Sequence, residues 1–444
     1  MGWSTLFILV AALSLVAAEP PDKTLDTIPV LYYGANWNRS EVNIDVLARM
    51  QVVVLMQEDG DCWAMCCPKR FENAGQCGWQ ANDAPATSIP GCNASCAQHG
   101  AQEQTFARIK ASAKQQGLRP PHFVLYMNGV YLWPFDAASA LGDQARVLDI
   151  QGEPHAESCD PGIFPSWFFD FSRAAGAQAW LNLVKTHVVS GVADGVYVDC
   201  DGTVPFHCPS PSGGADDVCI ARRNGREKSV HENVTRAQVE AYVAGKNATQ
   251  LEAYRLVSAS GGAWYNKGAP PGRNASECVT WDPAKHAGRT PGDCAGNMIW
   301  IDKVGELPPP PQLAKDIEAN MAAGYEYVVV GGANAYSNPK KETPQKGQDL
   351  ADGRSLRTCP DSAVAAFLLA VQPGAYLLCN GWDARFGRAL GLPRGAAAYD
   401  AENKVWTRSF AGGAVASWNE TAATGHVRWP GGDEMVEHEG RAVL

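Results

Sequence analysis

The stretch Ala193-Asp194-Gly195-Val196-Tyr197-Val198-Asp199 decides the fold class of this chain. Three consecutive residues with a high preference for strands, Val-Tyr-Val, lie between a glycine and an aspartate, so Gly195–Asp199 is predicted to be a buried strand. An unbroken apolar run is typical of a strand that is covered on both faces, and such strands form parallel sheets. The segment therefore predicts an α/β protein in which Asp199 ends a central strand.

Seven further runs of this kind lie before and after it. Each is short, apolar and bounded by turn residues, which predicts a strand. They are Ile28–Gly34, Val52–Gln57, Phe123–Asn128, Arg255–Ser260, Met298–Asp302, Tyr325–Gly331 and Ala375–Asn380. Helical patterns lie between most of them, at Val42–Met50, Phe106–Gln116, Trp180–Val188 after a cap at Ser172, Val234–Leu256, Leu313–Met321 and Ser362–Val371. Eight strands that alternate with helices predict a closed (β/α)8 TIM barrel over residues 19–395, and a doubly wound open sheet is the alternative.

The pattern changes after the eighth run. Four short alternating segments, separated by Asn, Gly and Thr turns, are Ala397–Tyr399, Val405–Phe410, Ala414–Trp418 and His426–Trp429. They predict a small C-terminal antiparallel β region at residues 396–430, packed on the barrel, and the rest of the chain, 431–444, is an acidic tail. Before the seventh run, Pro308–Pro311 predict a stiff polyproline-like elbow.

Composition and charge limit the possible partners. The chain has 444 residues, of which 45% are hydrophobic and 19% charged, so it can bury a sizeable core. Its net charge of −10 argues against nucleic acid, because nucleic-acid binding depends on Lys and Arg side chains that neutralise phosphates.

The N-terminal residues and the cysteines predict a secreted protein. Leu6–Val16 form an apolar run that is too short to span a membrane, and small residues follow it, so residues 1–18 are predicted to be a signal peptide. The chain also has 14 cysteines, and six Asn-X-Ser/Thr sequons at Asn38, Asn93, Asn233, Asn247, Asn274 and Asn419. We expect a glycoprotein with disulfide-linked loops, extracellular or in the lumen of the secretory pathway, with no membrane insertion after signal cleavage. Zinc ligation by Cys62 and Cys66 is the alternative, which an oxidising compartment disfavours.

Polar and aromatic side chains collect where the predicted strands end, and the active sites of (β/α)8 barrels lie at this edge. The candidates are Trp37, Glu58, Asn128, Asp199, Asp201, Trp264, Tyr265, Asp302, Asn380 and Trp382. Carboxylates can act as nucleophile and acid/base, amides bind hydroxyls, and flat aromatic rings stack on sugar rings, so these residue types favour a carbohydrate site. Each has a structural alternative, since aspartates often cap helices and tryptophans often belong to the core.

The segment around the fourth strand resembles that of a known group of enzymes. Phe169-Asp170-Phe171-Ser172, a helix that contains Trp180, and the strand that ends in Asp199 are similar to barrel glycoside hydrolases of the α-glucosidase/α-galactosidase superfamily. Uncharacterised glycoside-hydrolase-like TIM-barrel proteins are more similar still, since they also end with a small β region like Thr407–Val415. The resemblance implies that Asp199 is the catalytic nucleophile and Asp302 the acid/base. The chain departs from the α-glucosidase pattern directly after this strand, which leaves the sugar open.

Two other functions compete for the same residues. Asp199-Cys200-Asp201-Gly202-Thr203 also resembles the first motif of haloacid-dehalogenase-type phosphatases, in which the first aspartate is phosphorylated and Mg²⁺ is held by later acids. That motif normally opens its fold, whereas three predicted strands precede it here. A barrel that binds sugars without cleaving them is the other alternative. We predict a secreted glycoside hydrolase that cleaves an oligo- or polysaccharide with Asp199 and Asp302 and needs no metal or organic cofactor.

Overall fold

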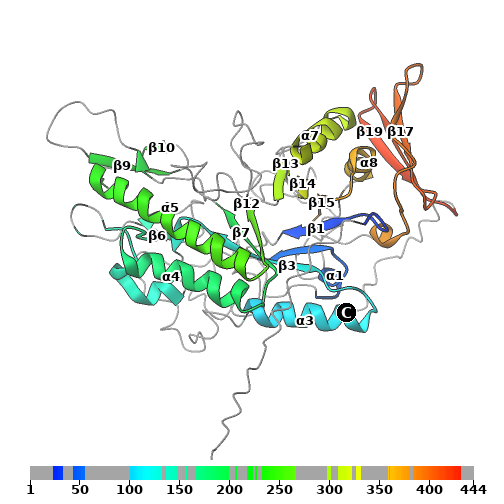
Figure 1. Cartoon of the computed structure of the whole chain (residues 1–444). Coiled ribbons are helices and arrows are strands. Elements are labelled where there is room, and N and C mark those ends of the chain that lie inside the picture. Colours follow the sequence, from blue (N-terminus) through cyan, green and yellow to red (C-terminus); the bar gives the residue numbers. More distant parts are fainter. Residues whose placement is uncertain are drawn as a thin grey trace, which may run out of the picture.

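The computed structural model describes residues 24–33, 44–55, 101–132, 137–148, 150, 152, 156–157, 166–199, 206–207, 218–223, 226–227, 233–266, 298–301, 309–322, 327–331, 359, 361–379 and 384–431. Its main body is a parallel β-sheet with helices around it, and a separate antiparallel sheet is built from the C-terminal part of the chain (Figure 1). The protein is therefore an α/β protein with a small β region, as predicted.

Eight strands form the central sheet. In chain order they are β1 (Val30–Tyr33), β2 (Val52–Leu55), β3 (His122–Asn128), β7 (Gly195–Asp199), β12 (Ala263–Asn266), β13 (Met298–Ile301), β14 (Tyr327–Gly331) and β15 (Ala375–Leu378). Their order in the sheet is β12-β7-β3-β2-β1-β15-β14-β13, and every ladder between neighbours is parallel. All predicted strands except the fifth overlap these elements, and the prediction for β7 has the same bounds as the strand itself.

The strand order shows that the sheet curls round on itself. From β1 to β12 the strands add on one side, whereas β13 to β15 return on the other side of β1. The step from β12 to β13 would cross the whole width of a flat sheet, but these two strands lie near each other, with Cα atoms within 8 Å. The first strand also pairs with the last, as a barrel requires. Among the described residues no ladder joins β12 to β13, so a curled parallel sheet is shown and its closure into a barrel is not.

Helices surround this sheet (Figure 1). They are α1 (Ile44–Leu47), α3 (Ala101–Gln115), α4 (Ala174–Val184), α5 (Arg236–Ala259), α7 (Pro310–Ala322) and α8 (Asp361–Ala370). Helix α4 continues into a π-helical turn at Lys185–Val189, and 3₁₀ segments lie at Ala137–Gln144 and Ala384–Gly387. The apolar sides of the helices cover the outer face of the sheet. Phe106 of α3, for example, packs on Phe123 of β3 with ring centroids 4.6 Å apart.

The predicted fifth strand is wrong. Arg255–Ser260 form the last turns and the C-cap of α5, and the strand is β12, at Ala263–Asn266. Gly261 has a left-handed conformation (φ +78°), and the amide of Gly262 donates to the carbonyl of Val257 (2.9 Å). This is the Schellman arrangement, in which a glycine ends a helix and the next residues satisfy its last carbonyls. The apolar residues before the two glycines therefore belong to the buried side of a helix.

Two other local predictions differ from the structure. Pro310 begins α7 and Pro311 lies in its first turn, so two of the three described residues of the predicted proline elbow are helical and only Pro309 is not. Proline is favoured at the first helical position, where its missing N–H costs no hydrogen bond. Ser172, the predicted N-cap of α4, lies one residue before the N-cap, Arg173, and its hydroxyl donates instead to the carboxylate of Asp170.

Two small antiparallel sheets, which no sequence pattern predicts, follow the carboxyl ends of β3 and β7. The first contains β4 (Tyr131–Leu132), β5 (Ala156–Glu157) and β6 (Ser166–Phe168). The second contains β8 (Phe206–His207), β9 (Val218–Arg223), β10 (Arg226–Glu227) and β11 (Asn233–Thr235). Aromatic contacts join them to α5, since the ring centroid of Phe206 lies 5.7 Å from that of Phe168 and 5.4 Å from that of Tyr242. Both sheets are thus anchored beside the ends of the central strands.

The predicted C-terminal antiparallel region is confirmed. It consists of β16 (Ala398–Asp400), β17 (Val405–Ser409), β18 (Val415–Asn419) and β19 (Thr424–Arg428), paired in that order. The sheet packs on α8, whose residues from Ala363 to Ala370 are all buried. Arg408 of β17 donates to three carbonyls at the C-terminal end of this helix, at 3.3, 3.1 and 2.8 Å. Burial lowers the pKa of Arg408 from its ordinary value. The region therefore completes the core around α8.

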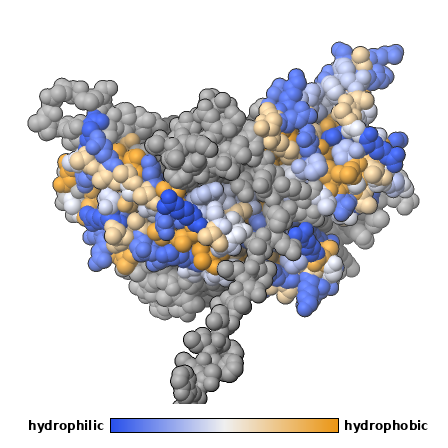
Figure 2. Space-filling model, in the orientation of Figure 1, coloured by the Kyte–Doolittle hydropathy of each residue, from blue (hydrophilic) through white to orange (hydrophobic). Residues whose placement is uncertain are grey.

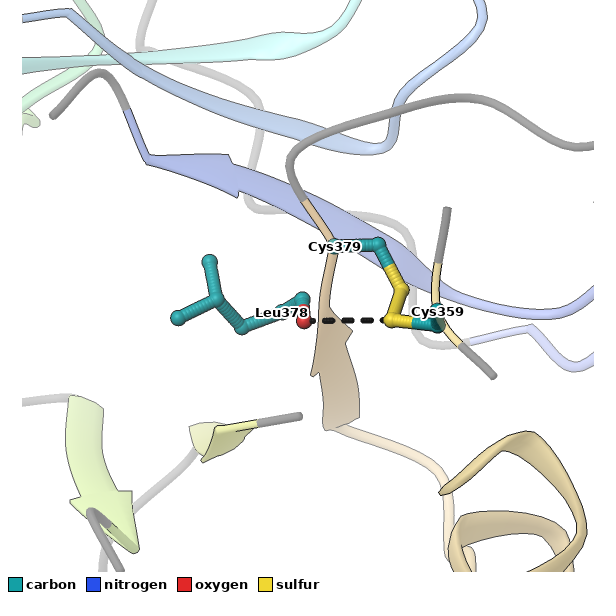
Figure 3. The surroundings of a disulfide bond; sticks show 3 residues. All are labelled: Cys359, Leu378 and Cys379. Carbon is teal, nitrogen blue, oxygen red and sulfur yellow. Dashed lines mark hydrogen bonds between the residues drawn. A yellow bond between two sulfur atoms is a disulfide. The ribbon is translucent and has the colours of Figure 1, made fainter. Parts of the chain in front are cut away.

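A disulfide links the segment before α8 to the end of the eighth strand (Figure 3). Cys359 and Cys379 are both buried, and the Cys359 sulfur lies 3.5 Å from the carbonyl oxygen of Leu378. Cys219 of β9 is also a disulfide cysteine. The other cysteines lie outside the described residues, so their pairing stays a prediction.

The described surface shows no large apolar patch on the face drawn in Figure 2, where hydrophilic and hydrophobic residues alternate over α4, α5 and the C-terminal sheet. The large exposed hydrophobic residues are Leu118, Leu141, Ile150, Val189, Leu392 and Tyr399. Within the part of the chain that the structure describes, no helix has the length and apolar character needed to cross a membrane.

Candidate active site

The strand register divides the central sheet into an inner and an outer face. Paired residues of neighbouring parallel strands point to the same side, and the side alternates along each strand. Asp199, at the end of β7, pairs with Asn128 of β3, and Tyr197 pairs with Tyr126. Tyr265 of β12 pairs with Tyr197 and so shares this side. Residues of the opposite parity, such as Phe123, point to the helices, which makes the side of Asp199 the inner one.

Asp199 is the predicted catalytic residue that the structure describes. This residue is half-buried and lies at the carboxyl end of β7. The phenol of Tyr126 donates a hydrogen bond to Asp199 Oδ2 at 2.8 Å. The ring of Tyr126 stacks on that of Tyr197, with centroids 5.8 Å apart and planes 29° apart, and Tyr126 is only 3% exposed. A buried neighbour therefore holds one oxygen of the carboxylate of a half-buried aspartate.

Hydrogen bonds also fix the backbone under this carboxylate. The amide of Gly129 donates to the carbonyl of Asp199 (2.7 Å). Asn128 Oδ1 accepts from the amides two and three residues later, at 2.9 and 2.8 Å, which turns the chain away from β3. The indole of Trp180 in α4 donates to the carbonyl of Asn128 (2.9 Å). The ends of β3 and β7 are thus tied to each other and to the helix behind them.

A second polar group lies at the opposite end of the same inner face. Tyr265 Oη lies 2.7 Å from His122 Nε2, and Asp194 Oδ2 lies 4.0 Å from His122 Nδ1 and accepts from the amide of Phe123 (2.8 Å). Gly195 makes room for the tyrosine, because a Cβ at this position would lie 2.7 Å from the Tyr265 ring. These residues mark the amino ends of the strands, where barrels carry stabilising residues, not catalytic ones.

Two predicted substrate-binding residues have packing roles instead. Trp264 lies on the outer face and is 2% exposed, and its ring contacts Tyr254 of α5 at a centroid distance of 6.1 Å. Tyr265 is 0% exposed and its hydroxyl is engaged with His122. The error has one cause: with the fifth strand predicted too early, both residues fell beyond its end, whereas they form the middle of β12.

The other predicted binding residues are described in part. Asn128 is 5% exposed, and its Oδ1 serves the turn after β3, so its contact with a substrate stays a prediction. Trp37, Glu58, Asp201, Asn380 and Trp382 lie outside the described residues, as does the predicted acid Asp302, which follows β13 directly.

The structure adds one residue to the site and gives another a structural role. Sequence analysis missed Tyr126, although its place two residues before Asn128 on an apolar strand puts both on one face. Asp170, in the segment that resembles glycoside hydrolases, is buried; it accepts from the amide of Ser172 (3.1 Å) and lies 3.0 Å from the guanidinium of Arg173. It therefore organises the start of α4.

Burial lowers the pKa of Arg146 after β3, and hydrogen bonds from Trp406 and Tyr399 lower the pKa of Glu420 in the C-terminal sheet. Among the described residues, no group of three His, Cys, Asp or Glu side chains could hold a metal ion.

Comparison with known proteins gives a distant likeness in fold. No family model and no curated protein matches the chain. A GH31 family sulfoquinovosidase from E. rectale is 13% identical and overlaps 82% of this chain and 44% of that chain with a TM-score of 0.40. A GH36 α-galactosidase from Geobacillus stearothermophilus is 11% identical, with 88% and 47% covered and a TM-score of 0.39. A cycloalternan-degrading enzyme from Trueperella pyogenes is 14% identical, with 82% and 44% covered and a TM-score of 0.36.

The chain spans less than half the length of each of these three proteins. The neighbours include glycoside hydrolases of families 31 and 36. At these identities and TM-scores the likeness assigns neither a family nor an activity to this chain.

Proposed function

We propose that the protein is a glycoside hydrolase in which Asp199 supplies one of two catalytic carboxylates. The observation that supports this most directly is the placement of Asp199, which is partly exposed at the carboxyl end of a central parallel strand and held by the buried Tyr126. Catalytic residues of barrel enzymes lie at this end of the strands. A carboxylate that is kept there can attack an anomeric carbon or activate a water molecule.

We propose Asp302 as the second carboxylate. Paired residues of neighbouring strands share one face of the sheet. Followed from β7 through each pair of strands to β13, the face of Asp199 is the face of position 300, which pairs with Val329. Because side chains alternate between the two faces along a strand, we expect position 302, two residues further on, to lie on the same face. Because β12 alone lies between β7 and β13 once the sheet closes, the two backbones would be about 10 Å apart. Carboxyl groups that lean inward from such strands reach the separation of about 5–9.5 Å that glycosidases use.

The separation of the two carboxyl groups would set the reaction course. At about 5–5.5 Å, Asp199 attacks the anomeric carbon as the bond to the leaving oxygen breaks, and Asp302 gives that oxygen its proton; water then cleaves the glycosyl ester with Asp302 as base. At about 6.5–9.5 Å, Asp199 instead takes a proton from the attacking water, and the configuration inverts. Neither course calls for a metal or an organic cofactor.

We further propose that the protein acts outside the cell or in the lumen of the secretory pathway. The predicted signal peptide at residues 1–18, the six sequons and the disulfide between Cys359 and Cys379 support this, since disulfides persist in oxidising compartments. We also propose that residues 19–395 form a fully closed (β/α)8 barrel and that residues 396–430 form the small β region. The substrate would be an oligo- or polysaccharide.

The test is a screen of the purified full chain on chromogenic α- and β-glycosides and on a glycan array. Asp199→Asn and Asp302→Asn should each lower kcat/KM by about 10³-fold or more, as expected when a catalytic carboxylate is removed. Asp316→Asn is the matched control, because this carboxylate accepts from Gln312 on the surface of α7 and should leave kcat/KM unchanged.

Two results would replace the proposal with an alternative. A wild-type protein that binds glycans and cleaves none of them would be a carbohydrate-binding barrel. Hydrolysis of a phosphate ester that needs Mg²⁺ and stops with EDTA would indicate the phosphatase.

A further inference from the structure

We infer that Tyr126 is a positioning residue that orients the catalytic carboxylate of Asp199; the inference rests on the proposed function. Tyr126 belongs to β3 and Asp199 to β7, and the pairing of these strands brings them together although 73 residues separate them along the chain. The phenol donates to Oδ2 of the aspartate at 2.8 Å. This contact lies on the inner face, at the end of the strands where the site is proposed.

Burial decides how Tyr126 acts. At 3% exposure Tyr126 offers almost no surface to a sugar ring that enters from solvent, whereas Asp199 is partly exposed. The stacked ring of Tyr197 also restricts rotation of the phenol. Tyr126 therefore acts through Asp199 and does not itself react.

The hydrogen bond restricts the orientation of the carboxylate. With Oδ2 engaged by the phenol, the carboxyl group is held in one plane at the end of the strands. Without the phenol the carboxylate would rotate, and misplaced catalytic groups react slowly even when substrate still binds.

The inner face offers a matched control in Tyr265. It is buried like Tyr126, it lies on the same side of the sheet, and its hydroxyl also has a short contact, 2.7 Å from His122 Nε2. That hydroxyl reaches His122, at the end of the strands opposite to Asp199. Tyr126→Phe and Tyr265→Phe thus each remove one buried hydroxyl, and only the first removes a contact with Asp199.

The experiment measures kcat and KM for both variants, on the glycoside that the wild type cleaves best. Tyr126→Phe should lower kcat about 10- to 100-fold with KM within about threefold of wild type, as expected for the loss of a hydrogen bond to a charged group. Tyr265→Phe should leave both kcat and KM within about twofold of wild type. Equal behaviour of the two variants would overturn the role of Tyr126.

A second measurement does not need activity. A double-mutant cycle of Tyr126→Phe and Asp199→Asn, read from urea unfolding, should show coupling between the two changes, and additive effects would overturn the inference. Failure of the role of Tyr126 can be distinguished from failure of the proposed function. If Asp199→Asn is inactive while Tyr126→Phe keeps the wild-type kcat and KM, only the role of Tyr126 is lost. If Asp199→Asn is fully active, the proposed function is lost, and this role with it.

Discussion

Substitution of Gly195 by alanine should destabilise the protein through the packing of the inner face. A Cβ at this position would lie 2.7 Å from the carbonyl oxygen of Ala263 and 2.7 Å from a ring carbon of Tyr265. The carbonyl belongs to β12, which pairs with β7 along its whole length, so it cannot retreat without breaking the ladder. The ring can shift only by giving up its contact with His122.

The magnitude follows from these two contacts. Forcing a methyl group into a packed core costs about 1–3 kcal/mol, and loss of the buried Tyr265 hydrogen bond costs about 1 kcal/mol. Alanine lowers the entropy of the unfolded chain and returns about 0.4–1 kcal/mol. Gly195→Ala should therefore lower the free energy of unfolding by about 2 kcal/mol.

The assay is urea denaturation followed by tryptophan fluorescence, on Gly195→Ala in the wild-type and Tyr265→Leu backgrounds. Leucine removes the ring carbon that the new methyl group would strike, so the cost of Gly195→Ala should fall by about 1 kcal/mol in that background. A cost below about 0.5 kcal/mol in the wild type, or the same cost in both backgrounds, would refute the placement of Tyr265 over β7.

Three further predictions concern the C-terminal half of the chain. Arg408→Met removes the donor that satisfies three carbonyls at the end of α8, and should lower the free energy of unfolding in urea by about 2 kcal/mol; a loss below about 0.5 kcal/mol would contradict the contact. Replacing Cys359 and Cys379 by serine opens a link between residues 20 apart, so oxidised wild type should exceed this variant by about 3 kcal/mol, and equal stability would count against the disulfide. The pKa of Glu420 lies below its ordinary value of 4.5, first because it accepts from Trp406, so its contribution to stability is present above that value and is lost as the pH falls through the lower, folded value. The difference in Tm between wild type and Glu420→Gln should accordingly shrink as the pH is lowered from 7 to below 4.5, and a difference that does not change over this range would contradict the prediction.

The central strands could be predicted from sequence because both faces of a parallel strand are buried. In β7 the run Val-Tyr-Val is continuous, and its first four residues from Gly195 are all buried. The fifth strand could not be placed in this way, because the buried end of an amphipathic helix gives the same short apolar run. Only the C-cap Ser260 and the glycines Gly261 and Gly262 separate α5 from β12. Apart from β9, the strands of the small sheets after β3 and β7 have only two or three residues, too few to show any periodicity.

The candidate site was predictable to the extent that it depends on strand ends. Asp199 could be chosen because it closes an unmistakable strand. Its contact with Tyr126 depends on the register between β3 and β7, which local sequence does not encode. The misplacement of Trp264 and Tyr265 has the same origin, since a shift of a strand by a few residues changes which side chains are buried.

An experimental structure of the full chain would test the central claim most directly, through the distance between the carboxyl groups of Asp199 and Asp302. The account predicts that both face one cleft on the inner side of the sheet, separated by about 5–9.5 Å. Carboxyl groups more than about 12 Å apart, or an Asp302 side chain that points to the helices, would contradict it.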